Sequence, residues 1–474
     1  MAIGLKLSAA LAYVHGAWVG PGTGDLAFGG VSSDSRAVVP GDLFVALRGP
    51  NFDGHDFIEA ALGAGALAAV ADRGAWAGRP VVMVKDGVKA LGHLAKGARR
   101  DLGFKALAVS GSVGKTTAKE MAKLILAAKG QEEFPGREVL ATSGNLNNEV
   151  GLPLSILKAL RAPVAPVYAV LEMGASALGD VAYLTEIARP DVGLLTALGP
   201  AHLESFGDLK TVARAKAELF AGLGPGGVAV ANRADPLVMA ELKALAANGR
   251  LKASRLHYGP GGQVWLKKTE PLGLWGQRLT IGGLAAEGLT VDLRLPGAAN
   301  AFNAVAAAAA ALAMGCGPLE IKKGLSATEP LAGRLKPALA ASGHYVLDDS
   351  YNANPASVEA GLRFLASLDR PGPKGAILGD MLELGPKAPE LHRAAGRLAA
   401  SLGLDFLALV GLFAQDALTG AQEAGAERPL AAVFDGPAAA AQWARKILGG
   451  RGLVLVKGSR AGGLERAVLE LLKD

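Results

Sequence analysis

Runs of apolar residues that alternate with amphipathic stretches divide this chain into three α/β segments. Residues 1–100 hold short strand-like and helix-like stretches. Residues 101–330 open with the apolar run KALAV and continue with strands that alternate with helices, which predicts a mostly parallel sheet. Residues 331–474 repeat this alternation and predict a second open sheet of Rossmann-like type, with ligands at the carboxyl ends of its strands. We therefore expect an α/β protein of three domains with these boundaries.

Individual elements can be placed within these segments. A helix is predicted from Thr117 to Gly130, where apolar residues recur at helical spacing before a glycine. A β-rich patch over residues 263–295 precedes a predicted helix over Ala298–Met314, whose alanine runs are typical of helix interiors. The other strand-like stretches are residues 167–174, 191–198 and 226–232, and HYVLDDS, KGAILGD, LDFLALVG, LAAVFDG and GLVLVKGS.

The sequence VSGSVGKTTAKEM, which begins at Val109, joins the KALAV strand to the helix that follows it. Strand, glycine-rich loop and helix form the arrangement of a P-loop, in which Lys115 would reach the terminal phosphates and Thr116 could ligate magnesium. Val109 stands where the usual pattern has its first glycine, so an ordinary strand-to-helix turn is the alternative. The residues expected to bind ATP here are Gly111, Ser112, Val113, Gly114, Lys115, Thr116 and Thr117.

Composition narrows the classes of function. The chain has 474 residues, of which 50% are hydrophobic and 19% charged, as in a compact α/β protein. Cys316 is its single cysteine, which excludes internal disulfides and thiolate metal cages. It shows no signal peptide and no apolar stretch of ~20 residues, so we expect a cytoplasmic protein without membrane insertion. The net charge of +6 is dispersed among acids and only 5% of residues are aromatic, which argues against nucleic acid and suits small polyanionic substrates.

Three polar residues of the middle segment are candidates for chemistry. Glu172 ends a predicted strand, where its carboxylate could hold magnesium opposite the P-loop or simply face solvent. His202 follows another strand at the same sheet edge, where histidines usually make structural hydrogen bonds and less often bind a ligand. Lys216 lies in the helical stretch TVARAKAELF, where a lysine normally extends to the solvent. These residues by themselves leave the alternatives open.

A series of motifs resembles, in order, those of the Mur ligases, which add amino acids or a dipeptide to the UDP-linked peptide precursor of peptidoglycan. DSRAVVPGDLFVALRG and DGHDF resemble the N-terminal uridine-nucleotide domain shared by the last two ligases of that pathway. SYNANP, LGDMLELG and VKGSR resemble the ligase that adds D-alanyl-D-alanine, whereas the third-residue ligase carries DNPR. Ala299 departs from the wider family pattern HNxxN, because it replaces the histidine. The remaining motifs, which extend the resemblance over essentially the full chain, are GSVGKTT, TSGNLNNEVGLP, LEMG, GPAHLESFG, RAKAELF, PGAANAFNAVAA, GRL and DDSYNANPASVEAGL.

The resemblance implies a reaction. ATP would phosphorylate the terminal carboxylate of UDP-N-acetylmuramoyl-tripeptide, and the amine of D-alanyl-D-alanine would attack the acyl phosphate. This chemistry needs positioning and charge neutralisation more than an acid–base pair. The residues that match the family's catalytic residues are Lys115, Glu172, His202 and Lys216. The resemblance also implies two magnesium ions, whose expected ligands are Thr116, Glu172, His202 and Lys216. Lys216 matches the lysine that the family carbamylates, a change that turns a cation into an anion able to bind magnesium.

Further contacts are implied by the same resemblance. For each of them a structural role, such as capping a helix, is the alternative. The family precedent also favours a monomer whose C-terminal domain closes over ATP. The matching residues are Asn303, Arg334 and Asp349 for ATP; Asn147 and Asn148, with Ser35, Arg36 and Asn51, for the UDP-substrate; Asn352, Asn354 and Asp380 for the dipeptide; and Lys457, Ser459 and Arg460 for anions.

Two other interpretations stay open. The first is a sibling ligase with a different amino acceptor; the N-terminal domain argues against a folate–glutamate ligase, and SYNANP against the third-residue ligase. The second is a P-loop protein whose ATP hydrolysis switches a partner. Such a switch would give no reason for a separate uridine-type domain.

Overall fold

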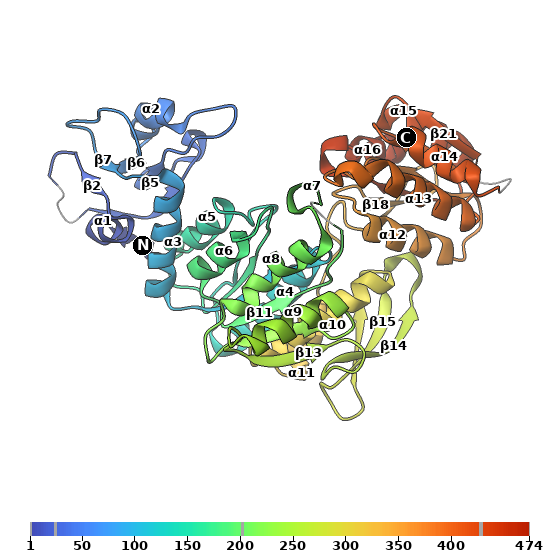
Figure 1. Cartoon of the computed structure of the whole chain (residues 1–474), viewed down its shortest axis with the longest axis horizontal. Coiled ribbons are helices and arrows are strands. Elements are labelled where there is room, and N and C mark those ends of the chain that lie inside the picture. Colours follow the sequence, from blue (N-terminus) through green and yellow to red (C-terminus); the bar gives the residue numbers. More distant parts are fainter. Residues whose placement is uncertain (1, 23–25, 201–202, 426–429, 474) are drawn as a thin grey trace.

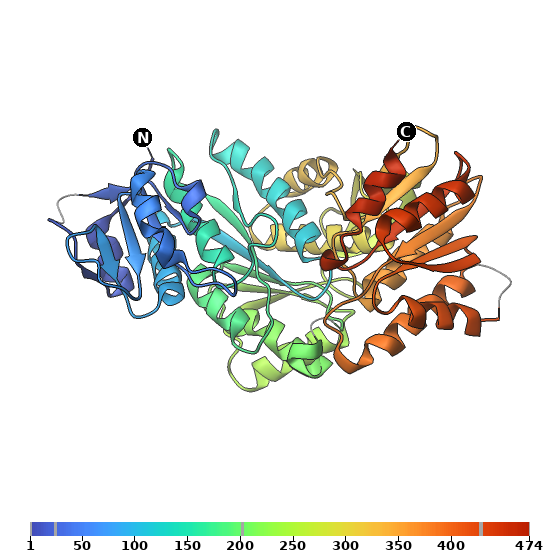
Figure 2. The ribbon, with the colours of Figure 1, turned by 90° about the horizontal axis from the view of Figure 1, so that it is seen from above.

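The computed structural model describes residues 2–22, 26–200, 203–425 and 430–473. In Figure 1 the N-terminal and C-terminal parts of the chain lie on opposite sides, above a central part. Seen from above, in Figure 2, the three parts form a row, each with a sheet and helices of its own. The predicted α/β fold class is confirmed, whereas the domain boundaries at residues 100 and 330 stay predictions. Within the described ranges, no helix combines the length and apolar character needed to cross a membrane.

The N-terminal part is built on a five-stranded sheet in the order β2-β7-β6-β5-β4, whose neighbours are parallel except for β2 and β7. Helix α3 joins this part to the centre, because Leu91 and Leu94 share one buried cluster with Leu43 of the N-terminal sheet and Leu184 of the central part. The elements are β1 (Leu5–Lys6), α1 (Leu7–Val14), β2 (Ala17–Trp18), β3 (Ala27–Phe28), β4 (Gly30–Ser32), β5 (Asp42–Val45), α2 (Ile58–Gly63), β6 (Ala68–Ala71), β7 (Val81–Met83) and α3 (Gly87–Leu102).

The central part contains a six-stranded, fully parallel sheet in the order β13-β12-β11-β8-β10-β9. The chain leaves β8 toward one side of the sheet and later returns to the other side with β11, so the carboxyl end of β8 is a topological switch point where α/β sheets bind ligands. The elements of the sheet and its helices are β8 (Lys105–Ser110), α4 (Lys115–Glu133), β9 (Leu140–Ala141), α5 (Gly151–Leu157), β10 (Tyr168–Glu172), α6 (Asp180–Ala188), β11 (Val192–Leu195), α7 (Leu203–Phe206), α8 (Leu209–Ala221), β12 (Val228–Asn232), α9 (Pro236–Ala247), β13 (Ser254–Tyr258), α10 (Ala298–Ala313) and α11 (Pro318–Ser326).

Helix α4 differs from the prediction that it ends at Gly130, since it continues to Glu133. A glycine inside a helix costs only ~1 kcal/mol relative to alanine. Gly130 is buried, and a β-carbon there would make only ordinary van der Waals contact with the Tyr168 ring, at 3.7 Å. The Gly130 carbonyl accepts from the Phe134 amide at 2.7 Å, so the helical hydrogen bonds continue past the glycine.

The predicted β-rich patch and alanine-rich helix are both present. The patch is an antiparallel three-stranded sheet of β14 (Trp265–Pro271), β15 (Gln277–Gly282) and β16 (Leu289–Leu293). Helix α10 follows it, and the run Ala304–Ala311 is completely buried. Small side chains let α10 approach α4 and the sheet closely, which explains a run of alanines in a core helix.

The C-terminal part has a second six-stranded sheet in the order β17-β18-β22-β19-β20-β21. All neighbours are parallel except β17 and β18, and helices cover both faces. All five strands predicted in this segment are present. The elements are β17 (Lys336–Leu339), β18 (Tyr345–Asp349), α12 (Pro355–Ser367), β19 (Lys374–Leu378), α13 (Ala388–Ser401), β20 (Phe406–Val410), α14 (Ala414–Glu423), β21 (Leu430–Phe434), α15 (Pro437–Leu448), β22 (Leu453–Lys457) and α16 (Glu465–Leu472).

Candidate active site

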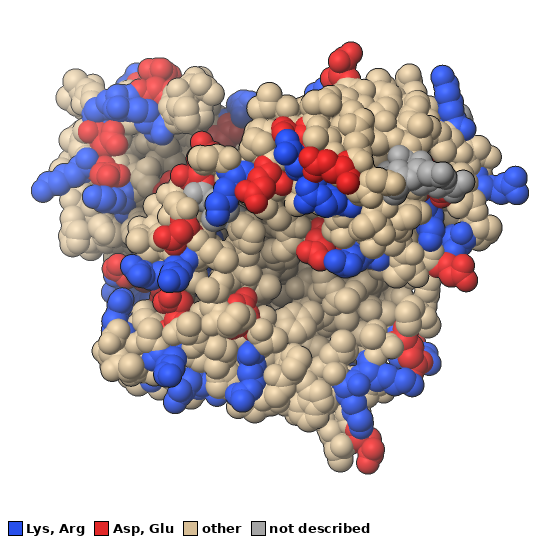
Figure 3. Space-filling view, turned by 45° about the vertical axis from the view of Figure 1, so that its right-hand side comes forward, with Lys and Arg blue, Asp and Glu red and all other residues tan. Residues whose placement is uncertain are grey.

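A cleft of about 1030 Å³ lies between the central and C-terminal parts. Figure 3 shows this face of the molecule hollowed, with charged side chains of both signs around the hollow. The cleft lies at the carboxyl end of β8, and the residues after β18 form its other wall. The predicted site residues that line it are Ser112, Val113, Gly114, Lys115, Thr116, Thr117, Asn147, Asn148, Glu172, Lys216, Asn303, Arg334, Asp349, Asn352, Asn354 and Lys457.

The glycine loop has the backbone that its sequence predicts. Gly111 and Gly114 have φ of +141° and +85°, in the region that favours glycine. A β-carbon at Gly111 would collide with the Thr196 hydroxyl, and one at Gly114 with the Asn303 amide. Val109 is completely buried within β8, so the loop begins after the strand and is shorter than the usual P-loop.

Lys115 and Thr116 begin helix α4 at the end of this loop. Gly114 offers no side chain to cap the helix, so the first amides of α4 remain available to an anion. The Lys115 ammonium donates to the Gly111 carbonyl at 2.7 Å. Burial lowers the pKa of Lys115, while the charge of Glu172 opposes this shift. A triphosphate would give this half-buried ammonium an ion-pair partner, which it lacks among the described residues.

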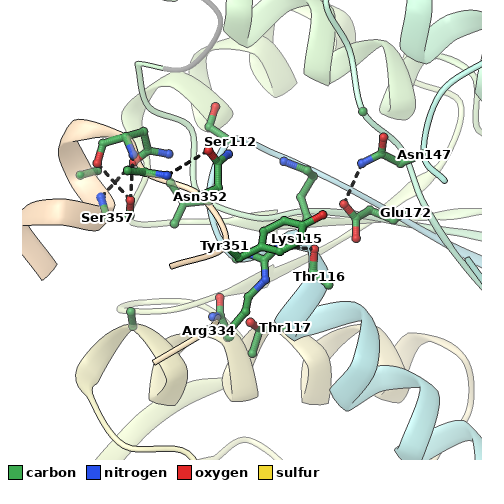
Figure 4. Close-up of a pocket in the computed structure, with 18 of the residues that line it drawn as sticks. Ser112, Lys115, Thr116, Thr117, Asn147, Glu172, Arg334, Tyr351, Asn352 and Ser357 are labelled. Atoms are coloured by element: carbon green, nitrogen blue, oxygen red, sulfur yellow. Dashed lines mark hydrogen bonds between the residues drawn. The ribbon is translucent and has the colours of Figure 1, made fainter. Parts of the chain in front are cut away.

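Glu172 ends β10 and is only 3% exposed. Its Oε1 accepts a hydrogen bond from Asn147 Nδ2 at 2.9 Å, as Figure 4 shows. Its Oε2 is buried without a hydrogen-bond partner in the described structure. An uncompensated carboxylate oxygen is costly to bury, so this atom fits a bound cation.

A magnesium ion at this place would have few protein ligands. Among the residues that the structure describes, no three His, Cys, Asp or Glu side chains are grouped to hold a metal. The Glu172 carboxylate and the Thr116 hydroxyl are oxygen donors of the kind magnesium prefers, and the ion commonly keeps waters and substrate phosphates as its remaining ligands. The donor set therefore fits magnesium brought with a nucleotide. His202, the other predicted ligand, lies outside the described residues.

Lys216 lies on α8, and its side chain turns inward. The residue is 1% exposed, and its Nζ donates to the Ala175 carbonyl at 3.2 Å. Burial, together with the nearby charge of Lys115, lowers the pKa of Lys216 to about 7. The expectation that such a lysine extends to the solvent is wrong at this position, because α8 packs against the sheet on the face that carries Lys216.

The segment that links the two parts places Arg334 across the cleft. Its guanidinium donates to the Thr116 hydroxyl at 3.0 Å and lies over the Tyr351 ring, 4.4 Å from the ring centre. Figure 4 shows Arg334 and Tyr351 next to the glycine loop. Tyr351 was not among the predicted site residues, although it lies within SYNANP and its ring would suit stacking on a guanidinium.

The polar residues of the C-terminal wall bind one another. Asp349 Oδ2 lies 2.7 Å from Lys457 Nζ, and its Oδ1 accepts from the Leu335 amide. Asn354 caps α12 in a reciprocal pair with Ser357. Both residues also line the cleft, so a structural role such as capping a helix is compatible with a contact to substrate.

Asp380 is not among the described residues that line the cleft. Its two carboxylate oxygens accept from the amides of Leu412 and Phe413, at 2.9 and 3.0 Å. This is the structural role stated as the alternative. Ser459 is likewise buried, and its hydroxyl accepts from the Leu382 amide.

The residues expected on the uridine side are placed in two regions. Asn147 and Asn148 line the cleft, and Asn148 Oδ1 also accepts from the Gly151 amide at the start of α5. Ser35, Arg36 and Asn51 belong to the N-terminal part, outside the described lining. Arg36 pairs with Asp34, and its side chain is 88% exposed. Ala299 lines the cleft without a polar group, and Arg460 lies 5.8 Å from the Tyr351 ring centre.

Comparison with known proteins places the chain in a family. Three family models match it: "Mur ligase family, catalytic domain" over residues 28–99, "Mur ligase middle domain" over 109–311, and "Mur ligase, glutamate ligase domain" over 333–460. The UDP-N-acetylmuramoyl-tripeptide–D-alanyl-D-alanine ligase of Escherichia coli is 36% identical over 82% of both chains. A crystal structure of MurF from Acinetobacter baumannii matches 99% of both chains with a TM-score of 0.88 at 31% identity. A MurF ligase from Thermotoga maritima in complex with ADP covers 93% of this chain and 96% of its own, with a TM-score of 0.78 and 30% identity. The resemblance noted in the sequence is confirmed: this chain belongs to the Mur ligase family.

Proposed function

We propose that this chain uses ATP to join D-alanyl-D-alanine to UDP-N-acetylmuramoyl-tripeptide, in the cytoplasm. The main support for this proposal is that the glycine loop, the unpartnered oxygen of Glu172 and the buried amine of Lys216 all line one cleft. Residues of the SYNANP segment line the facing wall of the same cleft. The relatives named for this reaction and the ADP complex of a similar structure support the proposal.

Two bond exchanges account for the reaction. A carboxylate oxygen of the tripeptide attacks the γ-phosphorus, and the bond from this phosphorus to ADP breaks. The dipeptide amine then attacks the acyl carbon, loses a proton, and phosphate leaves with the oxygen that had bridged carbon and phosphorus. ATP therefore supplies the leaving group that a free carboxylate lacks.

The residues of the central wall would neutralise charge in the first step. The loop amides and Lys115 would bind the β- and γ-phosphates. Arg334 would approach these phosphates from the segment that links the central and C-terminal parts. Magnesium, when bound at Thr116 and Glu172, would screen the repulsion between the phosphates and the attacking carboxylate. Asn147 would hold Glu172 in place, because it occupies the other carboxylate oxygen.

Lys216 would act after carbamylation. A pKa of about 7 leaves a large neutral fraction at physiological pH, and only the neutral amine adds to carbon dioxide. The addition forms an N–C bond and releases one proton, which leaves a carboxylate at the end of the side chain. This carboxylate would face the cleft as a ligand for a second magnesium ion, in keeping with the expectation of two ions.

Phosphate release tests the proposed function. The assay contains ATP, magnesium, UDP-N-acetylmuramoyl-tripeptide and D-alanyl-D-alanine, and each component is omitted in turn. We expect release to require all of them and the pentapeptide product to appear in equal amount. Release without the dipeptide would contradict the proposal, and release stimulated instead by a macromolecule would favour a P-loop switch.

A further inference from the structure

Lys119 is another buried lysine near the cleft, in addition to Lys216 and Lys457, and the proposed mechanism does not use it. It lies one helical turn after Lys115 on α4 and is 1% exposed. Its Nζ donates to the Thr142 carbonyl at 2.6 Å and lies 2.6 Å from the Glu120 carboxylate. A buried ammonium is costly unless it is paired, so its partners identify what it stabilises.

Thr142 connects this lysine to the candidate metal ligand. It follows β9 and is buried, and its hydroxyl accepts a hydrogen bond from the Glu172 amide at 2.9 Å. Its own amide donates to the Val170 carbonyl of β10 at 3.2 Å. Thr142 therefore accepts a hydrogen bond from Lys119 through its carbonyl and one from the Glu172 amide through its hydroxyl.

The chain after Thr142 forms the loop 143–150, which supplies five residues to the lining of the cleft. Asn147 of this loop donates to the Glu172 carboxylate through its side chain and accepts from the Gly174 amide at 2.7 Å through its carbonyl. Gly174 has no room for a side chain, because a β-carbon there would press against the Asn147 amide group. The loop and the end of β10 are thus fitted to each other. The lining residues of the loop are Gly144, Asn145, Asn147, Asn148 and Glu149.

We propose that Lys119 is a positioning residue that fixes the loop 143–150, and through it Glu172, against the helix that carries the glycine loop. Lys115 and Lys119 lie on the same face of α4, one turn apart. A single rigid helix therefore fixes the position of the glycine loop relative to the loop 143–150. For transfer, the γ-phosphate and the acceptor carboxylate must be held ~3–3.5 Å apart, within about 0.5 Å of the productive geometry. This role rests on the proposed function.

The test compares Lys119→Met with Lys123→Met. Methionine keeps the unbranched length of lysine without its donors. Lys123 lies on the same helix with a side chain 41% exposed, and its Nζ lies 3.9 Å from the Glu120 carboxylate. We expect Lys119→Met to raise KM for the UDP-tripeptide and lower kcat, each about tenfold or more, because the loop loses its anchor. The dissociation constant of ATP should change less than about twofold, and Lys123→Met should match the wild type. A role in stability alone would lower the unfolding temperature without this split between the two substrates.

Two outcomes would overturn the inference. One is an unchanged KM for the UDP-tripeptide and an unchanged kcat in Lys119→Met; the other is an equal loss of affinity for ATP. Thr142→Val supplies an independent measure, because it removes the acceptor of the Glu172 amide, and unchanged kinetics there would also refute the coupling. If Lys119→Met does not fold, Thr142→Val still tests the link from Thr142 to Glu172 on which the inference depends. Wild-type protein without dipeptide-dependent turnover would instead refute the proposed function.

Discussion

The two walls of the cleft differ in how their polar groups are satisfied. On the C-terminal wall, Asp349 pairs with Lys457, and Asn354 caps a helix. On the central wall, Glu172 Oε2 and the Ser112 hydroxyl are buried without partners in the described structure, and Lys216 has a lowered pKa. The central wall therefore carries polar groups that a ligand could satisfy, whereas Asp349 and Asn354 of the C-terminal wall already have partners within the chain.

Removing the charge of Glu172 tests the central wall most directly. We expect Glu172→Gln to lower kcat about 10²- to 10³-fold, because charge stabilisation in a buried site is worth several kcal/mol to the transition state. Steady-state phosphate release at saturating substrates measures this effect. The exposed Glu132→Gln on α4 is the control and should leave kcat unchanged. A loss below about threefold in Glu172→Gln would show that the unpartnered oxygen does not serve the reaction.

The amine of Lys216 should be needed nearly as much. We expect Lys216→Ala to lose about 10²-fold in kcat, and added short-chain carboxylic acids to restore part of it by supplying a carboxylate in the vacated space. The rescue should saturate with acid concentration, and it should not occur in Glu172→Gln. Turnover equal to that of the wild type would refute the carbamate role.

The lowered pKa of Lys216 also predicts a pH dependence of stability. Unfolded lysine titrates near 10.5 and the folded residue at about 7, so between these values the unfolded state binds more protons and stability rises with pH. The cost of the buried cation is present in full below about pH 7. Lys216→Met should therefore unfold several degrees above the wild type at pH 6, in ligand-free buffer depleted of carbon dioxide, and this difference should shrink toward pH 10. A difference that is constant with pH would contradict the assigned shift.

The smallest effect on activity is expected on the C-terminal side, at Asp380. Both carboxylate oxygens accept backbone amides of the loop before α14, so Asp380→Asn should lower stability by about 1–3 kcal/mol and change kcat and KM for the dipeptide by less than about threefold. Chemical denaturation and dipeptide titration separate these quantities. A large rise in KM for the dipeptide at unchanged stability would restore the predicted substrate contact and weaken the contrast between the walls.

Much of the fold followed from local patterns. Apolar runs predicted β8, β10, β11 and β12 of the central sheet and β18–β22 of the C-terminal sheet, because burial on two faces leaves a continuous apolar signal. The β-rich patch and α10 also lie where they were predicted. The edge strands β9, β13 and β17 were not predicted. The error at Gly130 arose because a glycine weakens a helix by only ~1 kcal/mol relative to alanine, and the hydrogen bonds of α4 continue past it to Glu133. The glycine loop was identified because Gly111 and Gly114 need conformations that other residues avoid.

The candidate site was less complete from sequence. Lys119 and Tyr351 were not singled out, although each lies inside a recognised motif. The sequence does not show whether a lysine on an amphipathic helix is buried or exposed. It also does not show that a guanidinium will pack on a given tyrosine ring. Asp380 lies outside the described lining and holds a neighbouring loop, so its expected contact with the dipeptide stays a prediction.

Residue spacing along the chain was enough to predict most strands of the central and C-terminal parts, the glycine loop and membership of the Mur ligases. The tertiary structure decided which polar atoms are left without partners, that Lys216 and Lys119 both face inward, and that Arg334 reaches Thr116 from the other part of the chain. These properties depend on contacts between residues far apart in sequence. The free energy of a buried charge is set by its surroundings, so only the assembled fold gives these lysines and this carboxylate their chemistry.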